Sequence, residues 1–348
     1  FRLYMQKLND SGGINGHPVE LTVQDDRGEP TQAASNMRKF TDQGVHMVRN
    51  TSTSATFAPT MQEAKRANIP VVFTLTAPQE AQPSTPDPLF YLASHGIGTQ
   101  SIWVYLDIMK TLTPSPKVGL LGLQIPQSSL QIQNMAKEAE RMGIPALVKI
   151  VPADTVDITP VAQAFQEWGA NWVFYTGPGA FSTMLFDALQ KAGWKGNVLD
   201  QSASVPFETT EQKYKGNPNV FVGSAYVPFS EDLAPHKELK EAAQKYGVTS
   251  VNSLYLIGWH DGIVFSQILK QTGWPVTTDK LVNVMQNLKA DRGPVMGPLK
   301  WTPTDHVGNY NLRIYKFQGD KLVGTGPWFV SDPLGQNRTS FKELKDIK

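Results

Sequence analysis

Small hydroxyl residues follow two predicted strands in the first quarter of the chain. The two segments contain Ser52, Thr53, Ser54, Thr74, Thr76 and Ala77. Ligands of open parallel sheets bind beyond the carboxyl ends of the strands, where helix N-termini present unpaired backbone N–H groups to anions. The two segments therefore favour a site for a ligand carboxylate, although Ser and Thr at such positions also cap helices.

Three later strand ends carry polar or small residues of a similar kind. They cover residues 122–127, 176–179 and 200–203, and include Gln124, Gln127, Thr176, Gly177, Gln201 and Ser202. We expect these ends to face the first set across a cleft, so that the two halves of the chain enclose one ligand.

The sequence contains no motif for catalysis. It has no P-loop, no G-x-S-x-G nucleophile elbow and no H-E-x-x-H zinc motif. The six histidines never pair at i, i+3 or i+4 as helical zinc ligands do, and no cysteine is present for a thiolate site. His260 and Asp261 are neighbours, but adjacent side chains of a helix point to different faces and make a poor catalytic dyad. We therefore predict no enzyme activity, no metal and no cofactor.

The composition predicts an ordinary globular protein. Hydrophobic residues make up 40% of the 348 positions and charged residues 18%, which supplies enough apolar side chain for sizeable cores. The net charge is +1 without a block of like charges, which argues against broad nucleic-acid binding. The longest apolar stretch, Val251 to Leu269, is interrupted by polar groups and too short to cross a bilayer.

Short apolar runs alternate with amphipathic helical stretches through most of the chain. This alternation is typical of β-α-β units and predicts an α/β fold with parallel sheets, and the length favours about two domains. Strands are predicted, among others, at residues 19–23, 69–73, 117–121, 171–175 and 322–323. The loop 74–88, rich in Pro, Ser and Thr, separates two such series.

The segment 9–21 resembles the opening of a known family. It reads Asn9-Asp10-Ser11-Gly12-Gly13-Ile14-Asn15-Gly16-His17-Pro18-Val19-Glu20-Leu21, followed by Asp25-Asp26 and Pro30. This pattern is similar to type I periplasmic solute-binding proteins of ABC transporters, the leucine/isoleucine/valine-binding protein family. Residues 67–72, 168–176 and 301–308 extend the resemblance over essentially the whole chain.

The resemblance implies two Rossmann-like lobes of the periplasmic binding protein type I fold, joined by a three-crossover hinge, with the ligand cleft between them. We expect residues 1–94 plus 226–299 in lobe 1, and 95–225 plus 300–348 in lobe 2. Hinge strands are expected near His95, Gly223 to Tyr226 and Gly297 to Thr302.

The resemblance also assigns roles to the candidate residues. The turn from Ser52 to Ser54 and the segment from Thr74 to Ala77 would hold the ligand carboxylate from lobe 1. Lobe 2 would supply side-chain and ring contacts from Gln124 to Gln127 and from Thr176 to Phe181. Gln201, Ser202 and the hinge residue Tyr226 complete the expected ligand contacts.

One departure from the family pattern bears on the ligand. Amino-acid binders of the family place an acidic residue near the loop 201–203 to neutralise the ligand's ammonium group, and here the nearest is Asp200, expected to be buried. An unpaired buried ammonium group is costly. We therefore expect a carboxylate without an amine, an aromatic acid of the benzoate or phenylpropanoid type. A branched-chain or other hydrophobic amino acid is the alternative ligand, and a sensory ligand-binding domain is the alternative class of protein.

The resemblance carries four further expectations. The protein would be monomeric, would deliver its ligand to a membrane permease of an ABC importer, and would be periplasmic or lipid-anchored outside the cytoplasm. A signal peptide would have been removed. Family members begin with a central strand ahead of the helix in which Phe1 lies, so we expect the present chain to be trimmed at its start.

Overall fold

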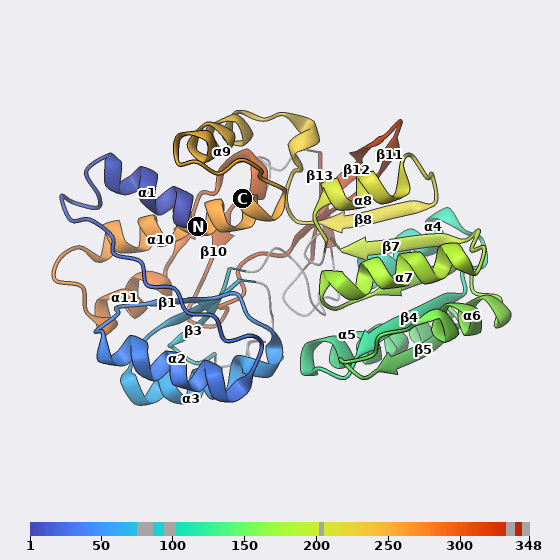
Figure 1. Ribbon diagram of the computed structural model, residues 1–348, viewed down its shortest axis with the longest axis horizontal. Coiled ribbons are helices and arrows are strands. Elements are labelled where there is room, and N and C mark those ends of the chain that lie inside the picture. The colour runs from blue at the N-terminus through green and yellow to red at the C-terminus, as the bar shows by residue number, and fades with distance from the viewer. Residues whose placement is uncertain (75–85, 94–101, 202–204, 332–337, 343–348) are drawn as a thin grey trace. The chain divides into compact units, whose positions relative to one another are not determined.

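The computed structural model describes residues 1–74, 86–93, 102–201, 205–331 and 338–342, which form two compact units (Figure 1). The described parts of residues 1–93 and 226–309 make up unit 1, and those of 102–225 and 310–342 make up unit 2. Both units combine helices with parallel strands, which confirms the predicted α/β class. Each unit is described separately below.

Unit 1 is built around a parallel sheet of three short strands in the order β1-β2-β3. The strands are β1 (Val48–Asn50), β2 (Val71–Phe73) and β3 (Phe90–Leu92). A small antiparallel pair, β9 (Lys289–Ala290) with β10 (Leu299–Lys300), belongs to the same unit. Its helices are α1 (Arg2–Asp10), α2 (Pro30–Asp42), η1 (Ser54–Thr56), α3 (Phe57–Ala67), η4 (Phe229–Glu231), α9 (Ala234–Lys245), α10 (Leu254–Thr272), α11 (Thr278–Met285) and α12 (Gly293–Met296).

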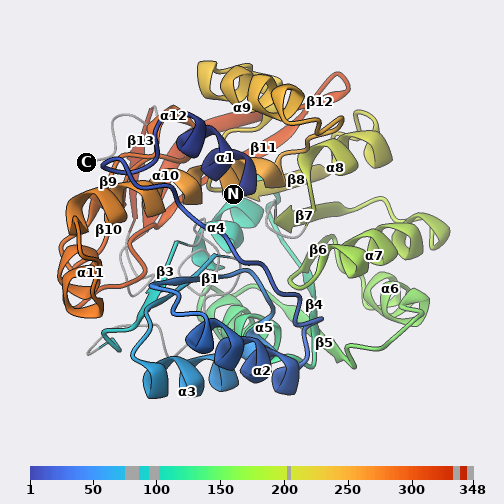
Figure 2. The same cartoon turned by 60° about the vertical axis from the view of Figure 1, so that its left-hand side comes forward.

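Helices cover both faces of the unit 1 sheet. α2 and α3 lie side by side below β1 and β3 in Figure 1, while α1 and α10 lie above them, and the turned view in Figure 2 shows the same layers. The local sequence explains the ends of these helices: Pro30 occupies the first turn of α2, and Asn68 ends α3 in the left-handed region with φ of 55°.

Apolar side chains from both sequence segments of unit 1 meet in its core. Met5, Val72 and Tyr91 pack with Val264 and Trp301, which are all buried. The Trp301 indole N–H also donates to the Leu92 carbonyl at 2.9 Å. Residues 300–309 consequently lie in unit 1, whereas the expected boundary placed them with the second lobe.

The strand predicted at Val19–Val23 is wrong. These residues run without a strand partner in the described structure, and their alternating apolar side chains are partly solvent-exposed: Leu21 is 37% and Val23 is 58% exposed. The alternation of apolar and polar residues is correct for a strand, but a strand also needs a neighbour for its backbone groups.

Unit 2 contains an eight-stranded mixed sheet in the order β13-β12-β11-β8-β7-β6-β4-β5. Its parallel part consists of β4 (Val118–Leu123), β5 (Ala146–Val151), β6 (Trp172–Tyr175), β7 (Asn197–Gln201) and β8 (Val220–Ser224). Three antiparallel strands follow: β11 (Asn311–Gln318), β12 (Lys321–Ser331) and β13 (Arg338–Phe341). The strand predicted at 322–323 is therefore only the start of a much longer one.

The helices of unit 2 pack on both faces of this sheet. They are α4 (Ile102–Leu112), α5 (Pro126–Arg141), α6 (Thr159–Glu167), α7 (Gly179–Lys191) and α8 (Phe207–Tyr214). Strand β4 is buried throughout, and its glycines allow close helix packing: a Cβ atom at Gly119 would lie 2.6 Å from the Phe165 ring of α6, and one at Gly122 would lie 2.8 Å from Ile132 of α5.

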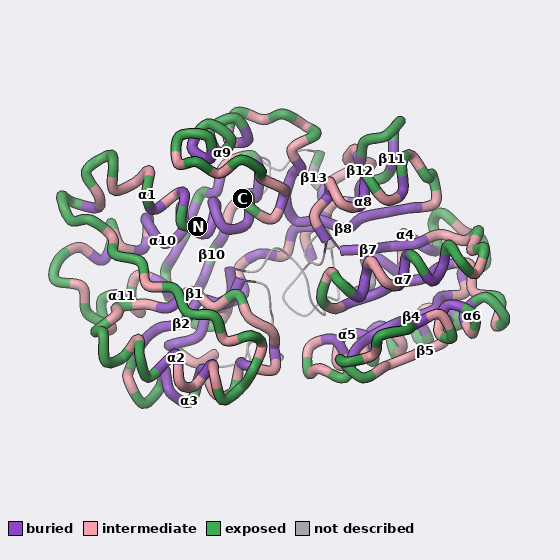
Figure 3. Tube along the Cα trace, in the orientation of Figure 1, coloured by how far each residue is buried: buried purple, intermediate pink, exposed green. Residues whose placement is uncertain are grey.

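The burial pattern follows these layers. The tube in Figure 3 is purple along most strands of both units and mostly pink or green along the surface helices, whereas the edge strand β5 is of intermediate burial throughout. α10 differs from the other helices because it is buried over most of its length, including Trp259 and His260. Among the described residues, no helix is both long and apolar enough to span a membrane.

Candidate functional site

The hydroxyl residues after β1 lie on a tight turn beside Asp26. The Ser52 backbone N–H donates to Asn50 Oδ1 at 2.7 Å, and the Ser52 hydroxyl donates to Asp26 Oδ1 at 2.7 Å. The Gly28 backbone N–H donates to the same Asp26 oxygen at 2.9 Å. Because the single hydroxyl proton of Ser52 is bound to Asp26, this side chain is presented to a ligand as an acceptor.

Thr53 and Ser54 open the helical segment that follows this turn. Thr53 is half-buried and precedes η1 without a side-chain capping bond, while Ser54 is buried at the first position of η1. η1 continues into α3, and neither helix has an acidic residue in its first turn. Backbone N–H groups at such a start lack intrahelical partners and favour an anion.

Thr74, at the end of β2, contacts the interior of unit 1. Its hydroxyl donates to Asp261 Oδ2 at 2.9 Å, and Arg49 binds the same oxygen at 2.6 Å. Thr74 is fully buried and Asp261 is 1% exposed. The Thr74 hydroxyl therefore stabilises a buried ion pair, and the expected contacts at Thr76 and Ala77 lie outside the described residues.

The neighbouring His260 has a different environment from Asp261, in agreement with the argument against a catalytic dyad. Its Nδ1 atom lies 2.7 Å from the Leu256 carbonyl oxygen, one turn earlier in α10. Burial lowers the pKa of His260 to about 3, so the ring is neutral at physiological pH. His260 and Asp261 therefore act on separate partners.

The candidate residues of unit 2 gather at the carboxyl ends of three adjacent strands, β4, β6 and β7. Gln124 is exposed and Gln127 half-buried near the start of α5. Thr176, after β6, is buried and donates its hydroxyl proton to Gln131 Oε1 at 2.6 Å. Ser128 of α5 donates to the Thr176 carbonyl at 2.5 Å, which joins the ends of β4 and β6.

Gly177 allows the chain to turn sharply from β6 toward α7. Its φ is 154°, and a Cβ atom there would lie 2.3 Å from the Tyr175 hydroxyl oxygen, which donates to the Pro178 carbonyl. Only glycine fits this position. The turn places Phe181, 8% exposed, in the first turn of α7.

Asp200 and Gln201 end β7 inside unit 2. The Gln201 backbone N–H donates to Asp200 Oδ1 at 2.8 Å, and the Ser182 hydroxyl donates to Asp200 Oδ2 at 3.0 Å. Burial raises the pKa of Asp200 to about 7, and these two hydrogen bonds oppose the shift only in part. The Gln201 side chain is 2% exposed, and Ser202 lies outside the described residues.

Tyr226, the remaining predicted contact, lies two residues beyond the end of β8 and is fully buried. It lies in unit 1, next to the point where the chain leaves unit 2. Within the ranges that the structure describes, no group of three or more His, Cys, Asp or Glu side chains could hold a metal ion.

The structure adds polar residues that sequence reasoning did not assign to the site. Asp26 binds the turn after β1, while Ser128 and Gln131 bind the end of β6. The Asp25-Asp26 pair belongs to the family-like pattern of the sequence, and this pattern could have indicated that Asp26 lies at the site. Ser128 and Gln131 gave no such indication, since polar residues one turn apart at a helix start are common.

Comparison with known proteins gives a consistent result. The sequence profile of a family described as periplasmic binding protein matches residues 1–321. No curated protein matches the chain.

Solved structures match over nearly the whole length. A fatty acid ABC transporter substrate-binding protein from Thermomonospora curvata has a TM-score of 0.79 at 17% identity, covering 98% of this chain and 89% of its own. A substrate-binding periplasmic protein from Ralstonia solanacearum has a TM-score of 0.81 at 15% identity, covering 93% of each chain. A branched-chain amino acid ABC transporter protein from Thermus thermophilus, with bound valine, has a TM-score of 0.79 at 16% identity, covering 95% of this chain and 91% of its own. The TM-scores and coverages show a shared fold.

Proposed function

Because the chain belongs to the periplasmic binding protein family, we propose that it captures a small carboxylate, an aromatic acid of the benzoate or phenylpropanoid type, for an ABC importer. Proteins of this family are solute-binding proteins of ABC transporters and not enzymes, and they work outside the cytoplasm. Within that setting, we propose a monomer that is periplasmic or lipid-anchored and docks on a membrane permease.

In this proposal the ligand carboxylate binds at the start of η1. Thr53 offers a hydroxyl without a capping role, and the backbone N–H groups at η1 favour negative charge. Ser52 and Asp26 fix the turn that precedes this helix start. The charge of the ligand is thus balanced by hydrogen bonds and helix geometry, in a protein whose net charge is +1.

Unit 2 contributes the contacts for the body of the ligand. Gln124 and Gln127 supply amide groups near the start of α5, and Phe181 supplies an aromatic ring at the start of α7. Gly177 lets the Tyr175 hydroxyl approach the backbone of the turn that leads from β6 to Phe181. An aromatic acid matches this combination of a ring contact and few charges.

The observation that carries the ligand class is the burial of Asp200. Both carboxyl oxygens accept hydrogen bonds inside unit 2, and the group is 1% exposed. The acidic residue nearest to the predicted second-lobe contacts is therefore withdrawn from a ligand amine. An ammonium group in the closed site would lack this partner, and burying a charge unpaired costs much more than burying a neutral polar group.

Binding is proposed to close a hinge between the lobes, with the hinge near residues 95, 223–226 and 297–302. We expected residues 1–94 and 226–299 in lobe 1, and residues 95–225 and 300–348 in lobe 2. The proposal keeps these bounds except for residues 300–309, which it assigns to lobe 1 because Trp301 packs in the core of unit 1. Ligand binding would select the closed state that the permease recognises.

A hydrophobic amino acid is the second candidate ligand, and Asp26 is the observation that favours it. Asp26 is half-buried beside Ser52, where its carboxylate could pair with an α-ammonium group. The Asp26→Asn variant separates the two candidates because the amide oxygen still accepts from Ser52 and Gly28, while the negative charge is lost.

A thermal-shift and calorimetric titration tests the proposal. We expect benzoate or 4-hydroxycinnamate, at about 100 times Kd, to raise the midpoint of unfolding by about 4 °C, and leucine, valine and octanoate to have no effect. A response to leucine or valine alone, abolished by Asp26→Asn, would assign an amino-acid ligand instead. A response to octanoate alone would also contradict the aromatic class.

A pair of threonine variants locates the carboxylate. Thr53→Val removes the hydroxyl and should weaken binding about 10-fold, the cost of one hydrogen bond to a charged group. Thr249→Val, at an exposed threonine in the loop between α9 and α10, is the matched control and should bind as the unaltered protein does. Equal affinities for both variants would remove Thr53 from the site.

A further inference from the structure

Two buried polar side chains of unit 2 have no hydrogen-bond partner among the described residues. They are the hydroxyl group of Tyr105, on α4, and the side-chain amide nitrogen of Gln201, at the end of β7. Tyr105 is fully buried and Gln201 is 2% exposed. Because a buried donor without a partner destabilises a protein, two such groups in one place indicate that a further molecule binds them.

The sheet of unit 2 brings the two groups together. Gln201 of β7 is paired in register with Gly223 of β8, and paired residues of neighbouring strands point to the same face of a sheet. A Cβ atom at Gly223 would lie 2.7 Å from the Tyr105 hydroxyl oxygen, so this hydroxyl occupies the place of a side chain at Gly223. Neighbouring strands are about 4.8 Å apart, and one oxygen atom between the two groups can therefore bond to both.

The packing around the pair agrees with this placement. Leu199 and Phe221 lie two residues before Gln201 and Gly223, and both pack with Tyr105 in one core cluster. Side chains two positions apart on a strand share a face. The pair therefore lies on the face that α4 and α5 cover, whereas Asp200 points to the other face, where Ser182 of α7 donates to it.

The pair lies at the edge of the sheet where ligands of parallel sheets bind. Gln201 is the last residue of β7, and Gly223 is the last but one of β8. Thr176, which follows the neighbouring strand β6, binds Gln131 of α5 on the same face. Because ligands bind beyond the carboxyl ends of parallel strands, the Tyr105 and Gln201 groups are placed to contact one.

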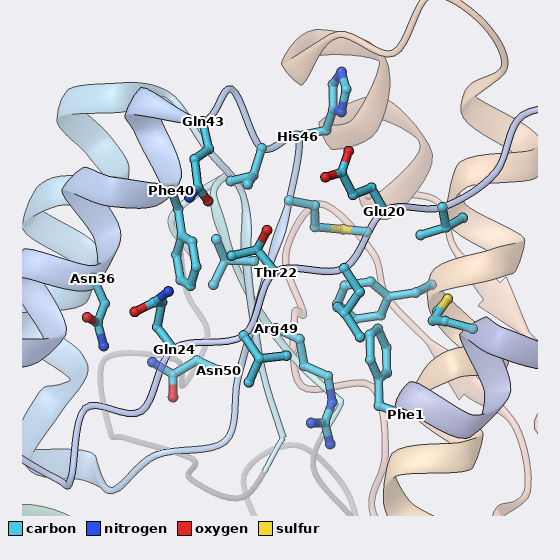
Figure 4. Close-up of a pocket in the computed structure, with 18 of the residues that line it drawn as sticks. Phe1, Glu20, Thr22, Gln24, Asn36, Phe40, Gln43, His46, Arg49 and Asn50 are labelled. Atoms are coloured by element: carbon cyan, nitrogen blue, oxygen red, sulfur yellow. The ribbon is translucent and has the colours of Figure 1, made fainter. Parts of the chain in front are cut away.

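A cavity of about 1160 Å³ in unit 1 has a different polar lining. It includes Asn36 and Arg49, which Figure 4 shows on different stretches of chain. Asn36 accepts a hydrogen bond from Gln32 at 2.8 Å, and Arg49 donates to Asp261 at 2.6 Å. Since both side chains have protein partners, neither requires a polar group of a ligand.

The donors and acceptors of the pair define the group that fits between them. The Gln201 amide nitrogen only donates, whereas the Tyr105 hydroxyl can donate and accept. Burial, and secondly the charge of Asp200, raise the pKa of Tyr105, so its hydroxyl stays protonated. A ligand hydroxyl can accept from Gln201 and donate to Tyr105. An ammonium group cannot bond to the Gln201 nitrogen, and a carboxylate would add a negative charge near that of Asp200.

We propose that Tyr105 and Gln201 form a subsite for a hydroxyl group on the ring of the bound acid, so that the protein selects hydroxylated aromatic acids. This inference rests on the proposed function and extends it to the end of the ligand that lies away from the carboxylate. Tyr105 would then determine specificity, and Gly223 allows its ring to lie against the sheet.

Calorimetric titration with two pairs of acids tests this subsite. The acids of each pair differ by one hydroxyl group: 4-hydroxybenzoate with benzoate, and 4-hydroxycinnamate with cinnamate. We expect the unaltered protein to bind the hydroxylated acid of at least one pair about 10-fold more tightly, because it satisfies two otherwise unpaired groups. Tyr105→Phe keeps the ring and removes the hydroxyl, and Gln201→Leu removes the amide donors. Each should reduce this ratio of affinities to about 3 or less.

Tyr214→Phe is the matched control. The Tyr214 hydroxyl is also buried without a partner among the described residues. It belongs to α8 and packs against Phe186 of α7, on the face of the sheet to which Asp200 points. This variant should keep the ratio of the unaltered protein. Because each ratio compares two ligands on the same variant, a general loss of stability cancels.

Three outcomes would overturn the subsite. Equal affinities within both pairs would do so and leave the proposed function standing. An equal fall of the ratio in Tyr105→Phe and Tyr214→Phe would remove Tyr105 from its role in specificity. Binding of none of the four acids would contradict the proposed function itself, and the subsite with it.

Discussion

Asp200 is a carboxyl group on which burial and hydrogen bonding act in opposite directions. The Ser182 hydroxyl and the Gln201 backbone N–H stabilise the carboxylate, but complete burial favours the neutral acid more strongly and raises the pKa from 3.8 to about 7. The folded protein therefore binds this proton between about pH 4 and pH 7, whereas the unfolded chain does not. The contribution of Asp200 to stability falls as the pH rises through this window and is constant above it.

We predict that Asp200→Asn removes this pH dependence. The amide keeps an acceptor for the Gln201 N–H, and the free energy of unfolding of the variant should gain about 3 kcal/mol relative to the unaltered protein between pH 5 and pH 8. Urea unfolding at four pH values measures this difference. Asp187→Asn is the control, since Asp187 is about half exposed in its ion pair with Lys213 and should show no comparable change. A constant difference for Asp200→Asn would contradict the raised pKa.

The sequence predicted the types of residue at the strand ends, but not their hydrogen-bond partners. Ser52 and Thr74 are the hydroxyls expected for a carboxylate, and both donate to carboxylates of the protein itself. Their acceptors are Asp26, 26 positions away, and Asp261, 187 positions away. Such partners are set by the fold and not by local spacing, so the acceptors of these two hydroxyl groups could not be predicted from the sequence alone.

Strand β4 shows how one element fixes the spacing of two helical layers. Its two glycines stand three positions apart among buried apolar residues and therefore face opposite sides of the sheet, Gly119 against α6 and Gly122 against α5. The missing side chains allow the Phe165 ring and Ile132 to approach the strand backbone. Because α5 carries Gln127 and Ser128, this approach also positions the candidate site at the end of β4.

We predict that Gly119→Ala destabilises the protein by about 1–3 kcal/mol, because the new Cβ would lie 2.6 Å from the Phe165 ring. Urea unfolding measures the loss. Gly119→Ala in a Phe165→Leu background is the matched test, since the smaller side chain makes room and the two costs should not add. Additive costs would show that α6 is not held by this contact.

Element prediction succeeded where the structure pairs a predicted strand with its neighbours. In unit 2, apolar runs such as 117–121 and 171–175 were predicted as strands and correspond to β4 and β6, which pair with each other. Val19–Val23 has a regular alternation but no strand partner among the described residues, so its pattern alone did not produce a strand. β12 is the opposite case. It contains Gly324, Gly326 and Pro327, which weaken a strand pattern, but pairing with β11 and β13 makes it one strand of 11 residues.

At the scale of the whole molecule, the two-lobed α/β fold could be predicted because a family-like pattern and the βα alternation pointed to the same answer. The resemblance also led to the non-contiguous lobes, which neither composition nor periodicity contains. The sequence did not indicate in which unit Trp301 packs, because a tryptophan at a strand end suits the core of either unit.

We predict that ligand binding brings the two units closer together. The chain contains no cysteine, so Lys39→Cys on α2 and Lys137→Cys on α5, both exposed, can carry a fluorescent dye pair. Energy transfer should rise on addition of the aromatic acid that binds in the thermal-shift titration. A control pair within unit 2, Lys137→Cys with Lys191→Cys, should not change. Unchanged transfer in the first pair at saturating ligand would contradict hinge closure.

The interrupted sequence of unit 1 has a consequence for biosynthesis. The parallel strands of unit 2, β4 to β8, lie within residues 118–224 and can assemble once that stretch has left the ribosome. Val72 and Tyr91, by contrast, pack with Leu281 and Trp301, which are made some 200 residues later. The apolar strands of the first ninety residues therefore remain exposed to solvent while unit 2 folds. During this interval we expect them to bind a chaperone that holds unfolded chains.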